Sequence, residues 1–423
     1  MEGVVLMRNK TLLALVALAA IVATACGGPA AQPSASTSPG ASATTAQLSG
    51  NVRVSGWSSS PAEDKLVTDA IDAFMKANPN VKVTWEPIAK DYDTVLKTNI
   101  AAGTEADVFY VDINWVGSLM TTGKLMALDD LMSKAKVAKS DFVPTLIDAF
   151  SNGGKVYGLP KDFNTLGLVY NKDVFTKQGV KEPTNDWTWA DLKQAAKDLT
   201  KNGVVGVSLP ADAARFVPFL WMAGGDITAI NNAAGTMATD YYTGFEAKDK
   251  TSKLPSELGM GWPGEALAKG KAAIAFEGGW LPAFLKSDYK DVKYGVVQLP
   301  KGPSSKSNLI FTVAYAMSAK TKNADAAFAV LNYLTGAENQ RKVLQSGFAL
   351  PTRQALASEI TDPGSKEIFN GAAYGKPFNY GGANNGKIND AINKQLEAII
   401  TGKSTVKDGL DKMANDLKPL VTP

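Results

Sequence analysis

The spacing of apolar residues after residue 50 alternates between the period of a strand and the period of a helix. Residues 51–55 alternate polar and apolar side chains, which predicts a strand, and residues 62–77 carry apolar side chains at helical spacing, which predicts a helix. The same patterns recur as a strand in 81–85, a helix in 91–102 and a strand in 107–112. This order is typical of right-handed βαβ units in a largely parallel sheet.

The remainder of the chain predicts further elements of both kinds. Thr188 followed by Asp191 is typical of a capping box, in which the two residues satisfy free N–H groups at a helix start. No internal repeat of 20–50 residues interrupts the pattern. We therefore expect an α/β fold. Its further strands are predicted at 155–160, 166–171, 272–276 and 294–299, and its further helices at 189–201, 324–334 and 387–400.

Two loops follow predicted parallel strands at their carboxyl ends, residues 56–61 and residues 112–115. Open sheets of this kind bind ligands in the crevice outside the carboxyl ends of their strands. We therefore expect the two loops to share one rim of a ligand site.

Length and composition narrow the classes of function. The chain has 423 residues, of which 45% are hydrophobic and 20% charged, so we expect a soluble globule divided into two domains or two lobes. A formal net charge of +3 argues against a nucleic-acid binder. Histidine is absent and cysteine occurs once, which excludes histidine triads, imidazole or cysteine zinc sites and an intramolecular disulfide. Carboxylate chemistry, serine–lysine chemistry and binding without chemistry remain.

The first 26 residues have the pattern of an export signal. Arg8 and Lys10 precede an apolar run over residues 12–23, which is shorter than the about 20 residues that a membrane span needs and is typical of a signal-peptide core. Translation could begin at Met1 or at Met7.

The segment around the single cysteine indicates how the mature protein is anchored to a membrane. Residues 23–27, Ala-Thr-Ala-Cys-Gly, resemble a bacterial lipobox, in which Cys26 is lipidated and becomes the first residue. Residues 27–49 carry no charge and consist mostly of Ala, Ser, Thr, Pro and Gly, which predicts a flexible tether. We expect a protein anchored to the outer face of the cell membrane, or a periplasmic lipoprotein; the alternative is a plain secretory peptide with an incidental cysteine.

Five short motifs after residue 50 occur in an order that resembles one known family. They are AAGTEADV at 101–108, GKVYGLP at 154–160 followed by LVYNK at 168–172, WTWADL at 187–192, GKAAI at 270–274 leading to EGGW at 277–280, and LPTR at 350–353. In this order they are similar to the extracellular solute-binding proteins of ABC importers, and within them to the sugar-binding group that includes maltose-binding protein. The resemblance covers nearly the whole chain after residue 50.

The resemblance implies a type II periplasmic-binding-protein fold, with two hinge-linked α/β lobes that have mixed, mostly parallel sheets and close on a ligand. Lobe one would comprise residues 50–160 and 300–345, and lobe two residues 161–299 and 346–423. Crossings between the lobes would fall near 161–164, 296–300 and 345–350. It also implies a monomer without catalytic residues, metal or cofactor, which delivers a carbohydrate to membrane permease subunits.

Candidate ligand-binding residues follow from what a sugar requires, namely aromatic rings for its apolar faces and fixed polar groups for its hydroxyls. Trp280 follows two glycines, which allow close approach of the backbone, and by resemblance it aligns with a tryptophan that stacks on sugar. Asp162 lies at the first crossing and aligns with a family carboxylate that accepts sugar hydroxyls. The other candidates are Asp112, Trp57, Trp115, Asn114, Gly279, Tyr315, Trp221 and Arg353, with Tyr380 ranked below them.

Structural roles stay open for each candidate. The tryptophans could close the core, Asp112 could cap a helix, Asp162 could be a surface acid, and Arg353 could tie the hinge.

The alternatives to carbohydrate in the same fold are a polyamine, an amino acid or another small solute, and a secreted glycosidase is an alternative function. A polyamine would use acids such as Asp112 and Asp162, and a secreted glycosidase would need two carboxylates flanking the scissile bond. The adjacent Tyr241 and Tyr242 resemble the tyrosine pair of iron(III)-binding relatives, but they fall in a predicted amphipathic helix over 238–248 and no histidine could assist them. Gly278 and Gly279 lack the GxxxxGK[ST] pattern of a phosphate loop.

Overall fold

The computed structural model describes residues 48–58, 61–378, 380 and 384–421, apart from the side chains of residues 61 and 62. The signal peptide, Cys26 and the tether up to residue 47 lie outside the described residues, so these expectations stay predictions. No helix within the described ranges combines the length and apolar character that a membrane crossing requires.

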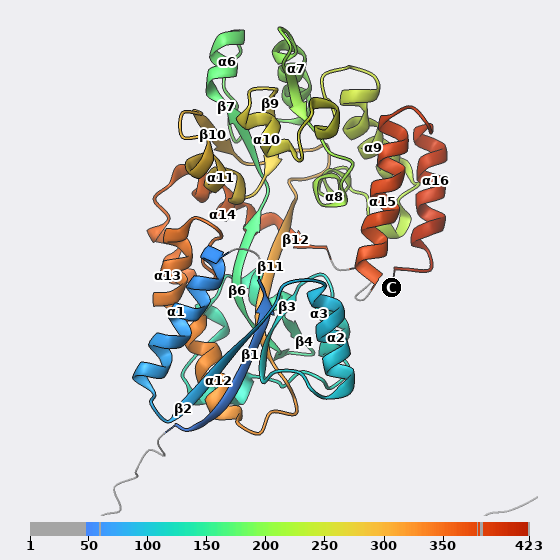
Figure 1. Ribbon diagram of the computed structural model, residues 1–423. Coiled ribbons are helices and arrows are strands. Elements are labelled where there is room, and N and C mark those ends of the chain that lie inside the picture. The colour runs from blue at the N-terminus through green and yellow to red at the C-terminus, as the bar shows by residue number, and fades with distance from the viewer. Residues whose placement is uncertain (1–47, 59–60, 379, 381–383, 422–423) are drawn as a thin grey trace, which may run out of the picture. The chain divides into compact units, whose positions relative to one another are not determined.

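The first of two main sheets contains six strands within the described ranges, in the order β12-β11-β3-β1-β2 with β6 also paired to β11 (Figure 1). Strand β1 runs parallel to both β2 and β3, as expected from the alternation of strands and helices. Strand β11 runs antiparallel to β3 and β6. The bounds are β1 (Gly50–Trp57), β2 (Val81–Ile88), β3 (Val108–Asp112), β6 (Gly158–Thr165), β11 (Asn308–Met317) and β12 (Gly375–Pro377).

The second main sheet has the order β10-β7-β9-β8. Strand β7 pairs antiparallel with β10 and β9, whereas β8 and β9 are parallel. The bounds are β7 (Gly167–Asn171), β8 (Val205–Ser208), β9 (Ala272–Glu277) and β10 (Tyr294–Val297). A separate short hairpin joins β4 (Ser151–Asn152) to β5 (Lys155–Val156).

Helices cover both sheets and make up most of the remaining chain (Figure 1). The α-helices are α1 (Pro61–Ala77), α2 (Tyr92–Ala102), α3 (Val116–Met120), α4 (Asp129–Lys134), α5 (Pro144–Ala149), α6 (Lys172–Gln178), α7 (Trp189–Leu199), α8 (Ala213–Met222), α9 (Ala233–Ala247), α10 (Pro263–Ala268), α11 (Trp280–Asp288), α12 (Ala324–Leu334), α13 (Ala337–Ser346), α14 (Pro363–Asn370), α15 (Asn385–Ile400) and α16 (Val406–Leu417). The 3-10 helices are η1 (Lys139–Asp141), η2 (Ile227–Ala229), η3 (Pro255–Leu258), η4 (Gln354–Glu359) and η5 (Gly371–Tyr374).

Two large apolar cores divide the chain into two lobes. The first core is built from residues between 52 and 159 together with residues 313–334, and the second from residues between 166 and 299 together with 309 and residues 378–417. A smaller cluster that includes Phe163, Ile310 and Leu350 lies where the long strands β6 and β11 pass between them. Figure 1 shows β6 and β11 side by side along this passage.

The strand pattern differs from the largely parallel sheets expected. Four of the eight pairings within the two main sheets are antiparallel in the part of the chain that the structure describes. The reason is the connectivity, because a strand that returns between lobes runs opposite to the strand that left. The mixed α/β architecture itself is as expected.

The return to the first lobe also differs from the expected crossing at residues 296–300. Strand β10 ends at Val297 inside the second sheet, and Leu299 and Leu309 both belong to the second core. The segment between them is held there by backbone hydrogen bonds, since Lys301 donates to Trp187 at 2.8 Å and Ser304 donates to Met222 at 2.9 Å. The chain crosses along β11 instead. The proposed lobe boundary at residue 300 would therefore move to about residue 309.

Several local predictions are confirmed by the elements. Helices expected at 62–77, 91–102 and 324–334 are found within one residue of these limits. The capping box of α7 is present: the Asp191 carboxylate accepts from the Thr188 N–H at 2.8 Å, and the Thr188 hydroxyl accepts from the Asp191 N–H.

Candidate functional site

The carboxyl ends of β1 and β3 lie next to each other, as the parallel pairing of the two strands requires. Trp57 ends β1 and is half-buried, with its ring edge-on to Tyr92 and Tyr110 at centroid distances of 5.4 and 5.1 Å. Asp112 ends β3, and one of its oxygens accepts from the Asn114 N–H at 2.8 Å. Burial raises the pKa of Asp112 to about 6, although the hydrogen bond from Asn114 opposes the shift. This rim thus carries a carboxyl group whose pKa is raised by burial.

Trp115, although on the same loop, is buried in the first core and is 3% exposed. Its ring lies beneath the Lys97 ammonium, 5.1 Å from the centroid. Trp115 therefore packs in the core, which is the structural role that was left open for the tryptophans.

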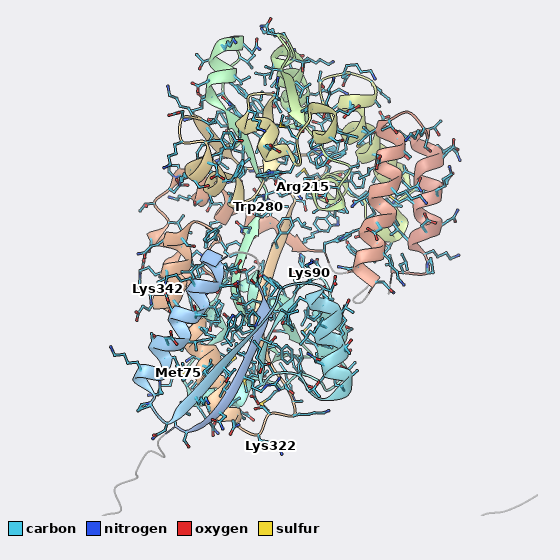
Figure 2. The ribbon with its side chains drawn as sticks, viewed as in Figure 1. Met75, Lys90, Arg215, Trp280, Lys322 and Lys342 are labelled. Atoms are coloured by element: carbon cyan, nitrogen blue, oxygen red, sulfur yellow. The ribbon has the colours of Figure 1, made fainter. Side chains whose placement is uncertain are left out.

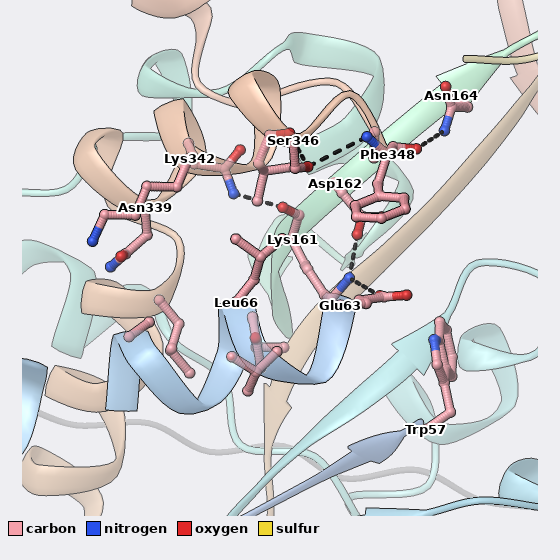
Figure 3. Close-up of a pocket in the computed structure, with 17 residues that line it drawn as sticks. Trp57, Glu63, Leu66, Lys161, Asp162, Asn164, Asn339, Lys342, Ser346 and Phe348 are labelled. Atoms are coloured by element: carbon pink, nitrogen blue, oxygen red, sulfur yellow. Dashed lines mark hydrogen bonds and ion pairs between the residues drawn. The ribbon is translucent and has the colours of Figure 1, made fainter. Parts of the chain in front are cut away.

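Strand β6 carries a buried lysine held between two carboxylates (Figure 3). The Lys161 ammonium pairs with its neighbour Asp162 and with Glu63 of α1, at 3.2 Å for Glu63. It also lies over the Tyr110 ring, 5.1 Å from the centroid. Burial alone would lower the pKa of Lys161, but the two carboxylates outweigh it and the pKa is raised. Lys161 therefore remains a cation, and it neutralises part of the negative charge of Asp162 and Glu63.

The backbone around Lys161 is fixed by a buried glutamine from α13. The Gln340 side chain is 1% exposed; it donates to the Lys161 carbonyl at 2.5 Å and accepts from the Thr352 N–H at 2.7 Å. The Thr352 hydroxyl in turn donates to the Pro160 carbonyl at 2.7 Å. The first and last crossing segments are thereby tied to each other.

A cavity of about 270 Å³, which we call the hinge cavity, opens beside this cluster (Figure 3). Its floor is apolar, with Leu66 and Val67 of α1 and Leu334 of α12. Its polar wall includes the Glu63, Lys161 and Asp162 cluster. The other lining residues are Trp57, Ala70, Asn164, Tyr315, Asn339, Gln340, Lys342, Val343, Ser346, Phe348 and Ala349. Three predicted residues, Trp57, Asp162 and Tyr315, thus meet in one cavity.

Trp280 begins α11, and its orientation is fixed by a buried ion pair (Figure 2). Its Nε1–H donates to Glu277 Oε2 at 2.7 Å, and the same oxygen accepts from Arg215 Nη2 at 2.5 Å. The Glu277 side chain is fully buried, and the Arg215 guanidinium lies 5.8 Å from the Trp280 ring centroid. Burial raises the pKa of Glu277, while Arg215 and Trp280 oppose the rise.

The two glycines before Trp280 serve close packing. A methyl group at Gly278 would overlap the Trp280 ring. At Gly279 the N–H donates to the Asn164 side-chain oxygen at 3.0 Å, which joins the start of α11 to β6. The backbone therefore makes the close approach that the two glycines predict, and the groups it approaches are the Trp280 ring and the Asn164 amide.

Trp280 and Gly279 line a second hollow of about 870 Å³, which we call the helix groove, between α11 and α13. Two ion pairs rim it: Arg341 with Glu359, at 2.5 and 2.6 Å, and Lys286 with Asp362, at 3.1 Å. Ser346 and Phe348 line both this groove and the hinge cavity, so the two hollows adjoin at the end of α13. The other lining residues are Pro282, Ala283, Phe284, Ser287, Leu344, Gln345, Gly347, Ile360, Thr361 and Ser365.

The remaining candidates lie in the cores or hold backbone together. Trp221 is 5% exposed in the second core and donates to the Tyr380 hydroxyl at 3.1 Å, and Tyr380 in turn contacts Asp226. Arg353 donates to the Thr335 carbonyl at 2.8 Å and lies over the Phe142 ring, 4.1 Å from its centroid. These contacts correspond to the structural role left open for Arg353, in which it holds the hinge segments together.

Tyr241 and Tyr242 lie on α9 and donate their hydroxyls to the backbone, to Trp189 at 2.6 Å and to Pro210 at 2.8 Å. Burial raises the pKa of both, which disfavours tyrosinate. No cluster of three or more carboxylate or cysteine side chains suited to a metal occurs among the residues that the structure describes.

Several residues of the site were missed by the sequence reasoning. The sequence marks Glu277 only as part of the Glu-Gly-Gly-Trp motif, and Asn164 only as the end of a crossing. Glu63, Arg215 and Phe348 carried no signal, because their partners lie at distant positions in the chain.

Comparison with known proteins shows which proteins this chain resembles. The family described as bacterial extracellular solute-binding protein matches residues 57–341. A galactooligosaccharide-binding protein of Bacillus subtilis is 25% identical over 379 residues, 83% of this chain and 86% of that protein. A putative binding protein of Brucella abortus is 27% identical over 304 residues, 67% of this chain and 72% of that protein.

A solved structure agrees with the sequence relatives. An ABC substrate-binding protein from Listeria monocytogenes, in complex with cycloalternan, superposes with a TM-score of 0.76 at 27% identity, over 87% of this chain and 98% of that one. The resemblance predicted from the five motifs and the two-lobe type II fold are both confirmed. The chain belongs to the bacterial extracellular solute-binding protein family.

Proposed function

We propose that this protein captures a carbohydrate between its lobes and delivers it to the permease of an ABC importer. The observation that carries the proposal is Trp280, an aromatic ring held rigidly by Glu277 and Arg215 at the edge of the helix groove. An aromatic face of fixed orientation beside polar groups is what a sugar ring requires. The names of the Bacillus and Listeria relatives, which bind a galactooligosaccharide and cycloalternan, support a carbohydrate ligand.

The proposal assigns the predicted residues to different roles. Trp280, Gly279, Asp162, Trp57 and Tyr315 would contact ligand from the two adjoining hollows. Asp112 and Asn114 would act at the rim formed by the ends of β1 and β3. Trp115, Trp221 and Arg353 would support the lobes from within. A ligand that contacts both lobes binds the closed form better and shifts the population toward it, and the closed form would then dock on the permease.

The alternatives fit the charges less well. A polyamine would need unneutralised carboxylates, but Asp162 and Glu63 share the Lys161 cation. A glycosidase would need two carboxylates that flank the scissile bond, whereas Asp162 and Glu63 are both bound by Lys161. We therefore propose a binding protein without catalysis, metal or cofactor.

The cellular setting is also part of the proposal. The family is extracellular, and Cys26 would carry a lipid that holds a monomer to the outer face of the membrane through the tether at 27–49. Replacement Cys26→Ser should release the protein from the membrane fraction of producing cells. Retention of the variant in membranes would show that another anchor holds it.

Thermal unfolding with a ligand panel tests the main proposal. The panel contains mono- and oligosaccharides, polyamines and amino acids, with chromatography to detect turnover. A ligand at about one hundred times its Kd adds roughly 2.7 kcal/mol to the free energy of unfolding. We expect a shift with sugars and no cleavage. Stabilisation by a polyamine alone would refute the assignment of a carbohydrate ligand, and cleavage of a sugar would refute a function limited to binding.

A variant pair localises the binding. Trp280→Ala should weaken sugar binding by about 1 kcal/mol or more, whereas Trp187→Ala, which removes a partly buried tryptophan beside the second core, should leave affinity unchanged. Equal affinities for the wild type and Trp280→Ala would remove Trp280 from the site.

A further inference from the structure

Phe348 is an exposed aromatic residue in the place where the two hollows meet. Among the large apolar side chains in the described ranges, only Met237 and Phe348 are exposed, Phe348 by 41%. Pockets that bind ligands are lined mainly by apolar and aromatic side chains together with a few polar groups. Phe348 lines both the hinge cavity and the helix groove, so it touches the space beside Asp162 and the space beside Trp280.

The backbone at Phe348 is held in place by a turn and two hydrogen bonds. Gly347 ends α13 in the left-handed region, at φ 74°, a conformation that other residues rarely adopt. The Phe348 N–H donates to the Ser346 hydroxyl at 3.3 Å, and the Phe348 carbonyl accepts from the Asn164 side chain at 3.4 Å (Figure 3). The same Asn164 accepts from Gly279, directly before Trp280. One amide side chain therefore ties the backbones of both aromatic positions.

We infer that Phe348 is a second stacking platform, which binds a sugar ring adjacent to the ring on Trp280, so that the ligand has at least two rings. This inference rests on the proposed function and specifies its substrate class. The helix groove, at about 870 Å³, lies in the upper part of the roughly 300–1,000 Å³ range that holds drug-sized ligands, and it continues into the hinge cavity. Ser346 and Asp162 line the hinge cavity and supply polar groups for the hydroxyls of the second ring.

The chemistry of the platform distinguishes it from a generic apolar contact. A sugar stacks its C–H face on an aromatic ring, so leucine should replace phenylalanine poorly and tyrosine should replace it well. Because Phe348 is exposed, its removal creates no core cavity and should leave the unfolding midpoint of the free protein unchanged.

Calorimetric titration with sugars of one to four rings tests the inference. The probes are glucose, galactose, and the malto- and galacto-oligosaccharide series, against the wild type, Phe348→Ala, Phe348→Leu, Phe348→Tyr and Trp280→Ala. The exposed Met237 provides the matched control, Met237→Ala. We expect wild-type affinity to rise by at least tenfold from one ring to two or more. Phe348→Ala should lose about five- to fiftyfold toward the longer sugars, with Leu nearer Ala and Tyr nearer the wild type.

The outcomes separate the inference from the function on which it rests. If Trp280→Ala weakens sugar binding while Phe348→Ala binds like the wild type, the second platform is refuted and the sugar function stands. Monosaccharides that bind as tightly as longer sugars would also refute it. If no sugar of any length binds the wild type, the proposed function and the inference fail together.

Discussion

The buried pair of Glu277 and Arg215 yields a prediction whose size can be worked from the contacts. Glu277→Gln keeps the shape and an oxygen for the Trp280 Nε1–H, but it removes the charge that faces Arg215 at 2.5 Å. Breaking a fully buried pair from one side costs about 3–5 kcal/mol. Arg215 is 18% exposed and keeps Asp212 at 3.1 Å, so we expect the lower end, about 3 kcal/mol.

Urea unfolding, followed by circular dichroism, measures this loss as a lower midpoint at unchanged slope. Arg215→Met and the double variant complete a cycle. Removing both charges relieves the unpaired one, so the double variant should lose less than the sum of the single variants, by about 1–3 kcal/mol. Additive losses, or a Gln variant within about 0.5 kcal/mol of the wild type, would refute the claim that this pair is energetically coupled.

Three further predictions concern single positions. Burial and a hydrogen bond with Glu257 raise the pKa of Glu246 to about 8. Between this value and the ordinary pKa of 4.5, the folded protein keeps a proton on Glu246 that the unfolded chain has released. The free energy of unfolding therefore falls as pH rises from about 4.5 to about 8. Because the Glu246 side chain is only partly buried and solvent screens its charge, Glu246→Gln should add only about 1 kcal/mol at pH 9 and nothing at pH 4 by thermal unfolding; equal gains at both would contradict this. Gly278→Ala should displace the Trp280 ring and weaken sugar binding, whereas Gly386→Ala, where a methyl group meets open space, should not; equal affinities in calorimetry would place the ring elsewhere. Lys161→Met should lower the free energy of unfolding by about 3 kcal/mol in urea, and no loss would mean that Glu63 and Asp162 do not need their shared cation.

The sequence predicted those parts of the fold that depend on neighbouring residues. The helices at 62–77 and 324–334 show clear periodicity and begin and end where the pattern does. Strand β11 was not predicted, because Asn308–Met317 is buried almost throughout and lacks the alternation that identifies a half-exposed strand. The second crossing, expected at 296–300, was consequently placed about ten residues too early.

The site was predictable only in part, for a similar reason. Trp280 stands in a recognisable motif, but Arg215, which braces it through Glu277, lies 62 positions from Glu277 in the chain. Nothing in the sequence around Phe348 distinguishes it from a core residue, and its exposure of 41% is visible only in the folded chain. Pairings across lobes and the exposure of a side chain are properties of the folded chain.

Strand β11 also determines when this protein can fold as it is made. It supplies residues to the two large cores and to the smaller cluster between them, and its Val313 pairs with Asp112, about 200 positions earlier. Neither lobe can complete its core until β11 has been synthesised, after about three quarters of the chain. Contacts of such long sequence separation slow folding. Before β11 is made, a chain that already contains β3 and β6 still exposes the apolar surface that β11 later covers.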